Sequence, residues 1–276
     1  MIDAHFHCWQ LARGDYGWLT PALSPIYRDV GVADWWRHAQ THGIAGGVLV
    51  QAAPTEAETH YLLAQADAHP QVLGVVGWVD LLATDAVARI GQLAQHRKLK
   101  GLRPMLQDIA DPDWILQPGL APALQAMARQ GLVLDALILP VHLPRILALL
   151  AQHPDLRVVI DHGAKPSPAE PTSGWVEGLR AIAQAASPER VACKLSGLWT
   201  ELPAHSDSAA LTPWGEALLA VWGAERLIWG SDWPVLELAA DYDRWRAWSL
   251  EFLHQRCTPG QVQRVLGLNA RQMYRL

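Results

Sequence analysis

The sequence predicts an α/β fold: a single closed (β/α)8 barrel of the TIM type over residues 1–276. Short, nearly continuous apolar runs recur along the chain, separated by helix-like stretches, which is typical of parallel strands covered on both faces. The length of 276 residues is close to the roughly 250 residues of one such barrel, and no linker or repeat divides the chain. We expect eight strands, at Met1–Phe6, Gly46–Gln51, Val72–Val79, Gly101–Met105, Val133–Ile138, Arg157–Asp161, Val191–Leu195 and Arg226–Trp229.

Capping signals mark helices between these strands. The segments Thr55–Glu58 and Thr258–Gln261 fit the capping-box pattern of a helix start, and Gly43 and Gly131 follow helical stretches at C-cap positions. The C-terminal segment 238–276 is mostly helical, and we expect it to pack outside the barrel. A doubly wound open sheet is the alternative fold, but no glycine-rich phosphate turn follows any predicted strand. The closed barrel is therefore the better interpretation.

Composition and charge narrow the function classes. The net charge is −5 and the 22 Lys and Arg residues form no long basic cluster, so we expect no nucleic-acid partner. No apolar run reaches the roughly 20 residues of a membrane span, and the first residues do not form a secretory signal. Three widely spaced cysteines suit a reducing compartment. These observations predict a cytoplasmic protein with a small-molecule substrate, and they are compatible with a homo-oligomer.

Ionisable side chains gather at the predicted strand ends, where barrels of this type have their active sites. His5 and His7 alternate on the first strand, so both imidazoles can converge on one metal ion or one substrate oxygen. His162 follows the sixth strand and Asp232 the eighth. Each has a structural alternative, because the histidines can be surface or core residues and Asp232 a turn or capping residue. As a site, they would supply a carboxylate base and up to three imidazoles.

Two cations and several polar or aromatic residues are candidates for substrate contact. Arg103 and Lys194 lie within apolar strands, where a buried charge requires an anionic partner. Each can pair with a buried aspartate or contact the substrate, and the sequence leaves both open. Gln51 ends the second strand, and Trp9 and Trp233 lie beside strand ends, where indoles can stack on an apolar ligand face. Core packing is the alternative for each tryptophan.

Six segments with these polar residues or with turn-forming residues follow one another along the chain, at Ile2–His7, Lys100–Pro104, Asp161–Pro166, Cys193–Gly197, Trp229–Pro234 and Gly267–Tyr274. In this order they resemble the metal-dependent-hydrolase-like branch of the amidohydrolase superfamily. Within that branch they are most similar to sugar-acid lactonases such as L-fuconolactonase and L-rhamnonolactonase. The resemblance extends from residue 2 to residue 276, and Trp-Gly-Ser-Asp-Trp-Pro at 229–234 is its most specific part.

The resemblance implies an amidohydrolase-like barrel that hydrolyses a lactone ring. One divalent metal ion, taken as Zn²⁺, would be bound by His5, His7, Asp232 and His162. Some members work without a metal, so the same side chains could polarise the carbonyl directly. Asp232 would be the general base, and His162 would assist at the same carbonyl. Arg103 and Asp135 stand where a binuclear site would have a bridging Lys or Glu and a His, so we expect no two-metal centre.

The function that these residues suit best is hydrolysis of a sugar-acid lactone in carbohydrate metabolism. Asp232 would activate a water molecule that attacks the lactone carbonyl. A metal-dependent decarboxylase of an aromatic or dienoic acid is the alternative on the same barrel, because Arg103 could form part of a clamp for its carboxylate. A barrel that only binds a sugar acid would not need so many ionisable side chains in one place. The sugar and the ring size stay open at this point.

Overall fold

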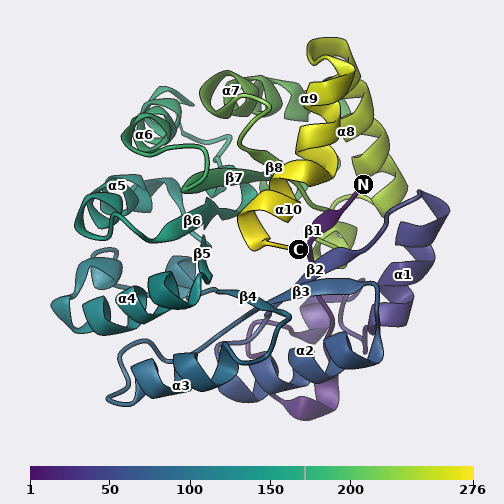
Figure 1. Ribbon diagram of the computed structural model, residues 1–276. Helices are drawn as coiled ribbons and strands as arrows, with labels where there is room; N and C mark the ends of the chain where they lie inside the picture. Colours follow the sequence, from purple (N-terminus) through teal and green to yellow (C-terminus); the bar gives the residue numbers. More distant parts are fainter. Residues whose placement is uncertain (171) are drawn as a thin grey trace.

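The computed structural model describes residues 1–170 and 172–276, which form one eight-stranded barrel surrounded by helices (Figure 1). All neighbouring strands are parallel and follow one another in chain order, and one of the helices α1–α8 follows each strand. The strands are β1 (Asp3–Phe6), β2 (Gly47–Val50), β3 (Val72–Gly77), β4 (Leu99–Leu102), β5 (Val133–Ala136), β6 (Arg157–Ile160), β7 (Val191–Leu195) and β8 (Leu227–Trp229).

The barrel closes between β8 and β1 through backbone bonds that lie just beyond β8. The N–H of Asp232 donates to the carbonyl of His5 at 2.8 Å, and the N–H of His7 donates to the carbonyl of Trp233 at 2.8 Å. These bonds continue the sheet from the last strand to the first. The predicted (β/α)8 barrel is therefore confirmed, and the open doubly wound sheet is excluded. The same bonds fix Asp232 beside His5.

The helices begin and end largely where the capping signals predict. Thr258–Gln261 forms a complete capping box, and Gly131 ends α4 in the left-handed conformation with φ 69°. At α2 the hydroxyl of Thr55 accepts from the N–H of Glu58, but the Glu58 carboxylate turns inward to accept from Tyr16. The helices are α1 (Val32–Thr41), α2 (Glu56–Ala68), α3 (Ala86–Leu93), α4 (Ala121–Gln130), α5 (Leu143–Gln152), α6 (Thr172–Ala185), α7 (Thr212–Trp222), α8 (Tyr242–Arg256), α9 (Pro259–Gln263) and α10 (Asn269–Tyr274).

The C-terminal helices occupy two different places. α8 packs outside the barrel as predicted, and its buried Trp245 donates from Nε1 to the carbonyl of Gly230 at 2.8 Å. α10 instead lies across one end of the barrel (Figure 1). From there the Tyr274 hydroxyl reaches into the barrel and contacts both carboxylate oxygens of Asp135 at 3.0 and 2.9 Å. None of the helices in the two described ranges is long and apolar enough to cross a membrane.

β4 begins and ends earlier than the predicted segment 101–105. Pro104 has no N–H to donate to a neighbouring strand, so the ladder stops before it. The N–H of Arg103 still donates to the carbonyl of Gly77 at 2.8 Å. Arg103 is thus tied to the carboxyl end of the sheet, and this is why its side chain can reach the centre of the barrel mouth.

Candidate active site

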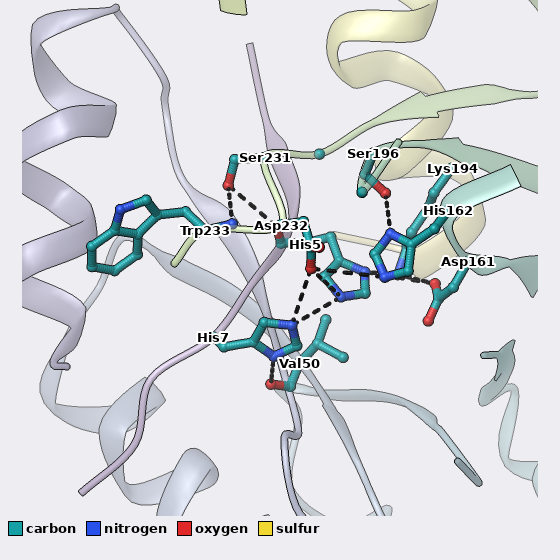
Figure 2. Close-up of polar contacts among 12 residues, drawn as sticks. His5, His7, Val50, Asp161, His162, Lys194, Ser196, Ser231, Asp232 and Trp233 are labelled. Carbon is teal, nitrogen blue, oxygen red and sulfur yellow. Dashed lines mark hydrogen bonds and ion pairs between the residues drawn. The ribbon is translucent and has the colours of Figure 1, made fainter. Parts of the chain in front are cut away.

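Four ionisable side chains meet at the carboxyl end of the barrel (Figure 2). His5 belongs to β1 and His7 follows it, His162 follows β6, and Asp232 follows β8. The residues are almost fully buried, with exposed fractions of 0%, 3%, 3% and 4% in that order. The structure therefore brings together the four residues from which the sequence predicts the reaction centre.

The three imidazoles converge on one carboxylate oxygen. Asp232 Oδ1 lies 3.3 Å from Nε2 of His7 and 3.6 Å from Nε2 of His5. The Nε2 atom of His162 lies 3.7 Å from the same oxygen. The Nε2 atoms of His5 and His7 are 3.2 Å apart. Three nitrogens around one oxygen can bind a cation, or they can surround a water molecule and the oxygen of a substrate carbonyl.

The segment 230–232 is folded so that the Asp232 carboxylate faces the histidines. Gly230 packs against His5, and a Cβ atom on Gly230 would lie only 2.8 Å from the Cβ of His5. The N–H of Ser231 donates to the buried carboxylate of Asp3 at 2.8 Å. Asp232 has φ 58°, in the left-handed region that Asp and Asn tolerate better than other residues with a side chain. These contacts explain why the Gly-Ser-Asp sequence turns its carboxylate into the barrel.

His162 is positioned by a left-handed turn. The residues of 162–165 have φ values between 50° and 61°, and this turn directs both His162 and Lys165 toward the same cavity. The Nδ1 atom of His162 lies 2.9 Å from the Ser196 hydroxyl. Gly197 leaves space for the ring, because a Cβ atom there would overlap it. The Asp-His-Gly-Ala-Lys sequence thus directs His162 and Lys165 into the cavity, where a right-handed backbone would point them elsewhere.

Burial and neighbouring charges set the protonation states of the centre. Burial lowers the pKa of His162 from 6.5 to about 4, although the charge of Asp232 opposes this shift. Burial and the charge of Lys194 lower the pKa of His5 well below its usual range. Burial raises the pKa of Asp232, but the interactions with His162 and His7 outweigh it and leave this pKa below its ordinary value. At neutral pH the centre therefore holds an ionised carboxylate beside neutral His5 and His162 rings.

The structure places Lys194 beneath the cavity and not in it. Its fully buried ammonium lies 2.5 Å from Asp135 Oδ2, 2.8 Å from Asp161 Oδ1 and 3.0 Å from His5 Nδ1. Burial raises the pKa of Asp135 to about 6 against the opposing charge of Lys194. Burial acts in the same direction on Asp161, but Lys194 and His5 outweigh it and hold that pKa well below its usual range. Of the two roles considered for Lys194, the ion pair is the one observed.

Arg103 forms the ion pair of one predicted role, and its place at the cavity leaves the other, substrate contact, open. It lines the cavity, and its Nη1 atom lies 3.3 Å from Asp161 Oδ2 and 3.4 Å from His5 Nε2. Its Nη2 atom donates to the backbone carbonyl of Gln51 and to the side-chain Oε1 of Gln51, the latter at 3.1 Å. The Gln51 amide in turn donates to the carbonyl of Arg103 at 3.0 Å. Gln51 is fully buried, so it orients Arg103 and does not itself line the cavity.

The predicted stacking residues Trp9 and Trp233 also lie outside the cavity. Trp9 is fully buried and donates from Nε1 to the carbonyl of Arg28 at 2.8 Å. Trp233 points away from Asp232 (Figure 2) and donates from Nε1 to Glu237 Oε1 at 2.7 Å. Both are core residues, the alternative that the sequence left open. Trp233 follows Asp232, which lines the cavity, and its indole turns to the other side of the backbone.

The centre forms the floor of a cavity of about 280 Å³. Most of its wall lies outside the set of predicted site residues, although the sequence places Lys165 in the loop after the sixth predicted strand and Trp18 in the loop after the first. Lys165 would pass for a solvated surface lysine, but it lies 3.4 Å from Glu201 Oε1 at the cavity. The lining residues are His7, Trp18, Leu23, Ala52, Arg103, Met105, Gln107, Asp108, Leu137, His162, Lys165, Thr200, Glu201, Asp232, Val235 and Leu238.

Comparison with known proteins identifies the family. The family model described as amidohydrolase matches residues 2–276. The chain belongs to the amidohydrolase family. It is 46% identical to an L-fucono-1,5-lactonase of Burkholderia ambifaria, over 100% of this chain and 95% of that protein. It is 32% identical to an L-fucono-1,5-lactonase of Burkholderia multivorans, over 100% of this chain and 96% of that protein.

A solved structure extends the comparison to the fold. The crystal structure of an amidohydrolase from Burkholderia multivorans, with bound zinc, superposes on this chain with a TM-score of 0.93 and 31% identity. The match covers 100% of this chain and 99% of that one. The resemblance predicted from the sequence motifs is therefore confirmed at the level of the family, and the barrel is that of the amidohydrolases.

The donor set of His5, His7 and Asp232 fits a divalent metal ion. The distances between their facing atoms are 3.2, 3.3 and 3.6 Å. A tetrahedral ion with nitrogen ligands at about 2.0–2.1 Å spaces its ligands about 3.3 Å apart. The ring of His7 is also oriented for this role, because its Nδ1 lies 2.8 Å from the carbonyl of Val50 and must donate to it. The Nε2 atom of neutral His7 therefore offers a lone pair toward Asp232.

Proposed function

We propose that this chain hydrolyses a sugar-acid lactone of the L-fucono-1,5-lactone type. The observation that carries the proposal is Asp232, an ionised carboxylate at the floor of a cavity, at the meeting point of three imidazoles. The relative with 46% identity over the whole chain is a lactonase of this type. The geometry of the site and the similarity to this lactonase thus support the same reaction, the addition of water to a ring ester.

Asp232 acts as the general base. Its lowered pKa keeps the carboxylate ionised at neutral pH, so it can accept a proton from a water molecule held above the histidines. When the tetrahedral intermediate opens, the ring oxygen leaves as an alkoxide and needs one proton. Asp232 can return the proton that it took, and the open-chain hydroxy acid is the product. Positioned proton transfer of this kind contributes about 10²–10⁴-fold to the rate.

His162 and Arg103 supply hydrogen-bond donors to the carbonyl oxygen. When the Ser196 hydroxyl donates to Nδ1 of His162, the proton of the neutral ring resides on Nε2, which faces Asp232 and the cavity. Arg103 offers its guanidinium from the neighbouring wall, oriented by Gln51. Donors fixed in a buried site stabilise the developing oxyanion without rearrangement during the reaction.

We propose that His5, His7 and Asp232 hold one divalent metal ion, Zn²⁺ being the ion that two imidazoles and a carboxylate suit well. His162 would join these ligands only in the other tautomer, in which Nδ1 donates to Ser196 and Nε2 carries the lone pair. When bound, such an ion supplies Lewis-acid polarisation of the carbonyl. A single ion is favoured over two, because the charges of Arg103 and Lys194 flank His5 and oppose a second cation. In a metal-free form, the 3.2 Å contact requires His5 Nε2 to donate to His7 Nε2.

The cavity wall suits the hydroxyl groups of a sugar ring. Gln107 has a buried side-chain oxygen without a partner, and Glu201 and Lys165 face each other across 3.4 Å. Such groups can donate to or accept from ring hydroxyls. The Trp18 indole lines the same cavity and offers a flat apolar face for the C–H groups of the ring.

The direct test is acid release from L-fucono-1,5-lactone, followed with a pH indicator in weak buffer. Turnover above the spontaneous hydrolysis rate is expected, and its absence across a panel of aldonolactones would contradict the proposal. Carbon dioxide release from aromatic or dienoic acids is measured in parallel, because it would instead indicate the decarboxylase alternative. Elemental analysis of protein purified without chelator should find at most one divalent ion per chain, and two per chain would refute the single-ion site.

A further inference from the structure

A second hollow adjoins the catalytic cavity near the carboxyl ends of β3 and β4. Its volume is about 540 Å³, compared with about 280 Å³ for the catalytic cavity. Trp18, Met105 and Asp108 line both spaces, so the two adjoin at these side chains. Small-molecule sites commonly measure roughly 300–1,000 Å³. The catalytic cavity alone therefore suits a single lactone ring and leaves the hollow for an attached group.

The walls of this hollow are mostly apolar. Three half-buried indoles, Trp18, Trp78 and Trp114, surround it, and aliphatic side chains such as Ile109 fill the space between them. The Trp18 ring is held in place, because its Nε1 donates to the carbonyl of Ala52 at 2.7 Å. A preformed apolar surface next to a reaction centre favours binding of an apolar group.

The carboxylates of the hollow do not change this character. Asp15 is paired with Arg13 at 2.5 Å and accepts from the Thr55 hydroxyl at 3.2 Å. Asp80 and Asp108 are exposed to solvent and can remain hydrated at the rim. The floor therefore offers indole and aliphatic surface, while the rim carries negative charge that disfavours an anionic ligand.

We propose that the same reaction centre also hydrolyses δ-lactones that carry an alkyl substituent on the carbon next to the ring oxygen. The ring would occupy the catalytic cavity and the alkyl chain the hollow. This inference rests on the proposed ring-opening function. Water adds to the carbonyl carbon, the bond between that carbon and the ring oxygen breaks, and the alkoxide takes the proton that Asp232 removed from water. The resulting hydroxy acid releases one proton to the buffer, and no further reactant is needed.

The test is a chain-length series of δ-hexalactone, δ-octalactone, δ-decalactone and δ-dodecalactone. For wild type, kcat/KM should rise by about three- to fourfold for each methylene group that the hollow buries, until it is filled. Ile109→Asp and Trp114→Ala alter residues that line the hollow but not the catalytic cavity, and both should flatten the series. Val141→Asp is the matched control, since Val141 is 51% exposed and lines neither space.

L-Fucono-1,5-lactone, measured with every variant, separates this inference from the proposed function. Failure of wild type on that lactone would reject the function, whereas a flat alkyl series with intact sugar-lactone turnover would overturn only the inference. A rising series that both variants retain would place the alkyl chain elsewhere and also overturn it. A disaccharide lactone with a higher kcat/KM than every alkyl lactone, lost in Trp114→Ala, would show that the hollow binds a second sugar and would also overturn the inference. The wild-type protein could instead be a dimer that Ile109→Asp converts to a monomer, with no dependence of kcat/KM on alkyl chain length. That result would show that a second copy of the chain covers the hollow, and it would overturn the inference.

Discussion

Two groups of ionisable side chains lie at the carboxyl end of the barrel, and their surroundings differ. The reaction group, His7, His162 and Asp232, lines the cavity, and its Nε2 and Oδ1 atoms point to a common centre. The ion-pair group consists of Lys194, Asp135 and Asp161, which are fully buried and pair with one another; the Tyr274 hydroxyl of α10 contacts Asp135. His5 contacts both groups.

The comparison shows that ionisable residues at strand ends do not by themselves mark a reaction centre. Asp161 and His162 are neighbours in the chain but belong to different groups, because the backbone enters its left-handed turn between them. What separates the groups is access to the cavity and the presence of complete charge partners. A substitution in the reaction group should therefore affect turnover, and one in the ion-pair group should affect stability.

The largest effect is expected for Asp232→Asn. Loss of the base should lower kcat by about 10²–10⁴-fold. The variant should still fold, because Asn tolerates the left-handed φ of 58° at this position, with some loss of unfolding free energy because the interactions that lower the pKa of Asp232 are removed. Steady-state rates with a lactone substrate and a urea unfolding curve measure the two quantities. A variant that keeps more than about a third of the wild-type rate would show that Asp232 is not the base.

Lys194→Met should cost stability, because it leaves buried Asp135 without a cation and Asp161 with Arg103 alone. Removing one partner of a buried pair costs about 3–5 kcal/mol of unfolding free energy. Asp135, whose pKa is already about 6, can take up a proton in the variant and so lose its unpaired charge. The loss of unfolding free energy should therefore be smaller at pH 5, below this pKa, than at pH 8, above it. Lys165→Met is the control, since its pair with Glu201 is partly exposed to solvent and surface ion pairs contribute only about 0–1 kcal/mol. Equal losses for both variants would contradict the division into two groups.

Neutral, buried His162 should make the protein less stable in acid. Its pKa is about 4 when folded and 6.5 when exposed, so the unfolded chain binds more protons between these values. The stabilisation is complete above pH 6.5 and is lost as the pH falls toward 4, by about 3 kcal/mol in total. Urea unfolding at several pH values should show a shallower loss for His162→Gln. The pKa of His5 is also lowered, so His162→Gln should still lose some unfolding free energy in acid. If the unfolding free energy of wild type and variant fell equally with pH, His162 would not be the cause of the acid sensitivity.

Much of this organisation is readable from the sequence. The apolar runs locate the eight strands because parallel strands are covered on both faces, and the alternation of His5 and His7 places both rings on one side of β1. β4 ends before the predicted Met105, because Pro104 stops the ladder. A cytoplasmic location and the absence of a nucleic-acid partner stay predictions.

The remaining parts depend on distant contacts that local patterns do not encode. Lys194 of β7 pairs with Asp135 of β5 and with Asp161 just beyond β6, which lie 59 and 33 positions away in the chain. The sequence alone leaves substrate contact equally open. Lys165 reaches the cavity only because of the left-handed turn, whose non-glycine residues carry no clear signal for it. Trp18 belongs to a loop that is placed by its bond to Ala52.

The smallest effect is expected for Tyr274→Phe, at the far end of the ion-pair group. The variant removes the hydroxyl that contacts both oxygens of Asp135, while Lys194 continues to neutralise the carboxylate. A lost hydrogen bond of this kind should lower the unfolding free energy by about 1.5 kcal/mol. In the double variant with Lys194→Met the two losses should not add, because both act on the same carboxylate. The value of kcat/KM should stay unchanged, since Tyr274 does not line the cavity. A clear fall in kcat/KM with unaltered stability would show that the ion-pair group acts on catalysis through His5.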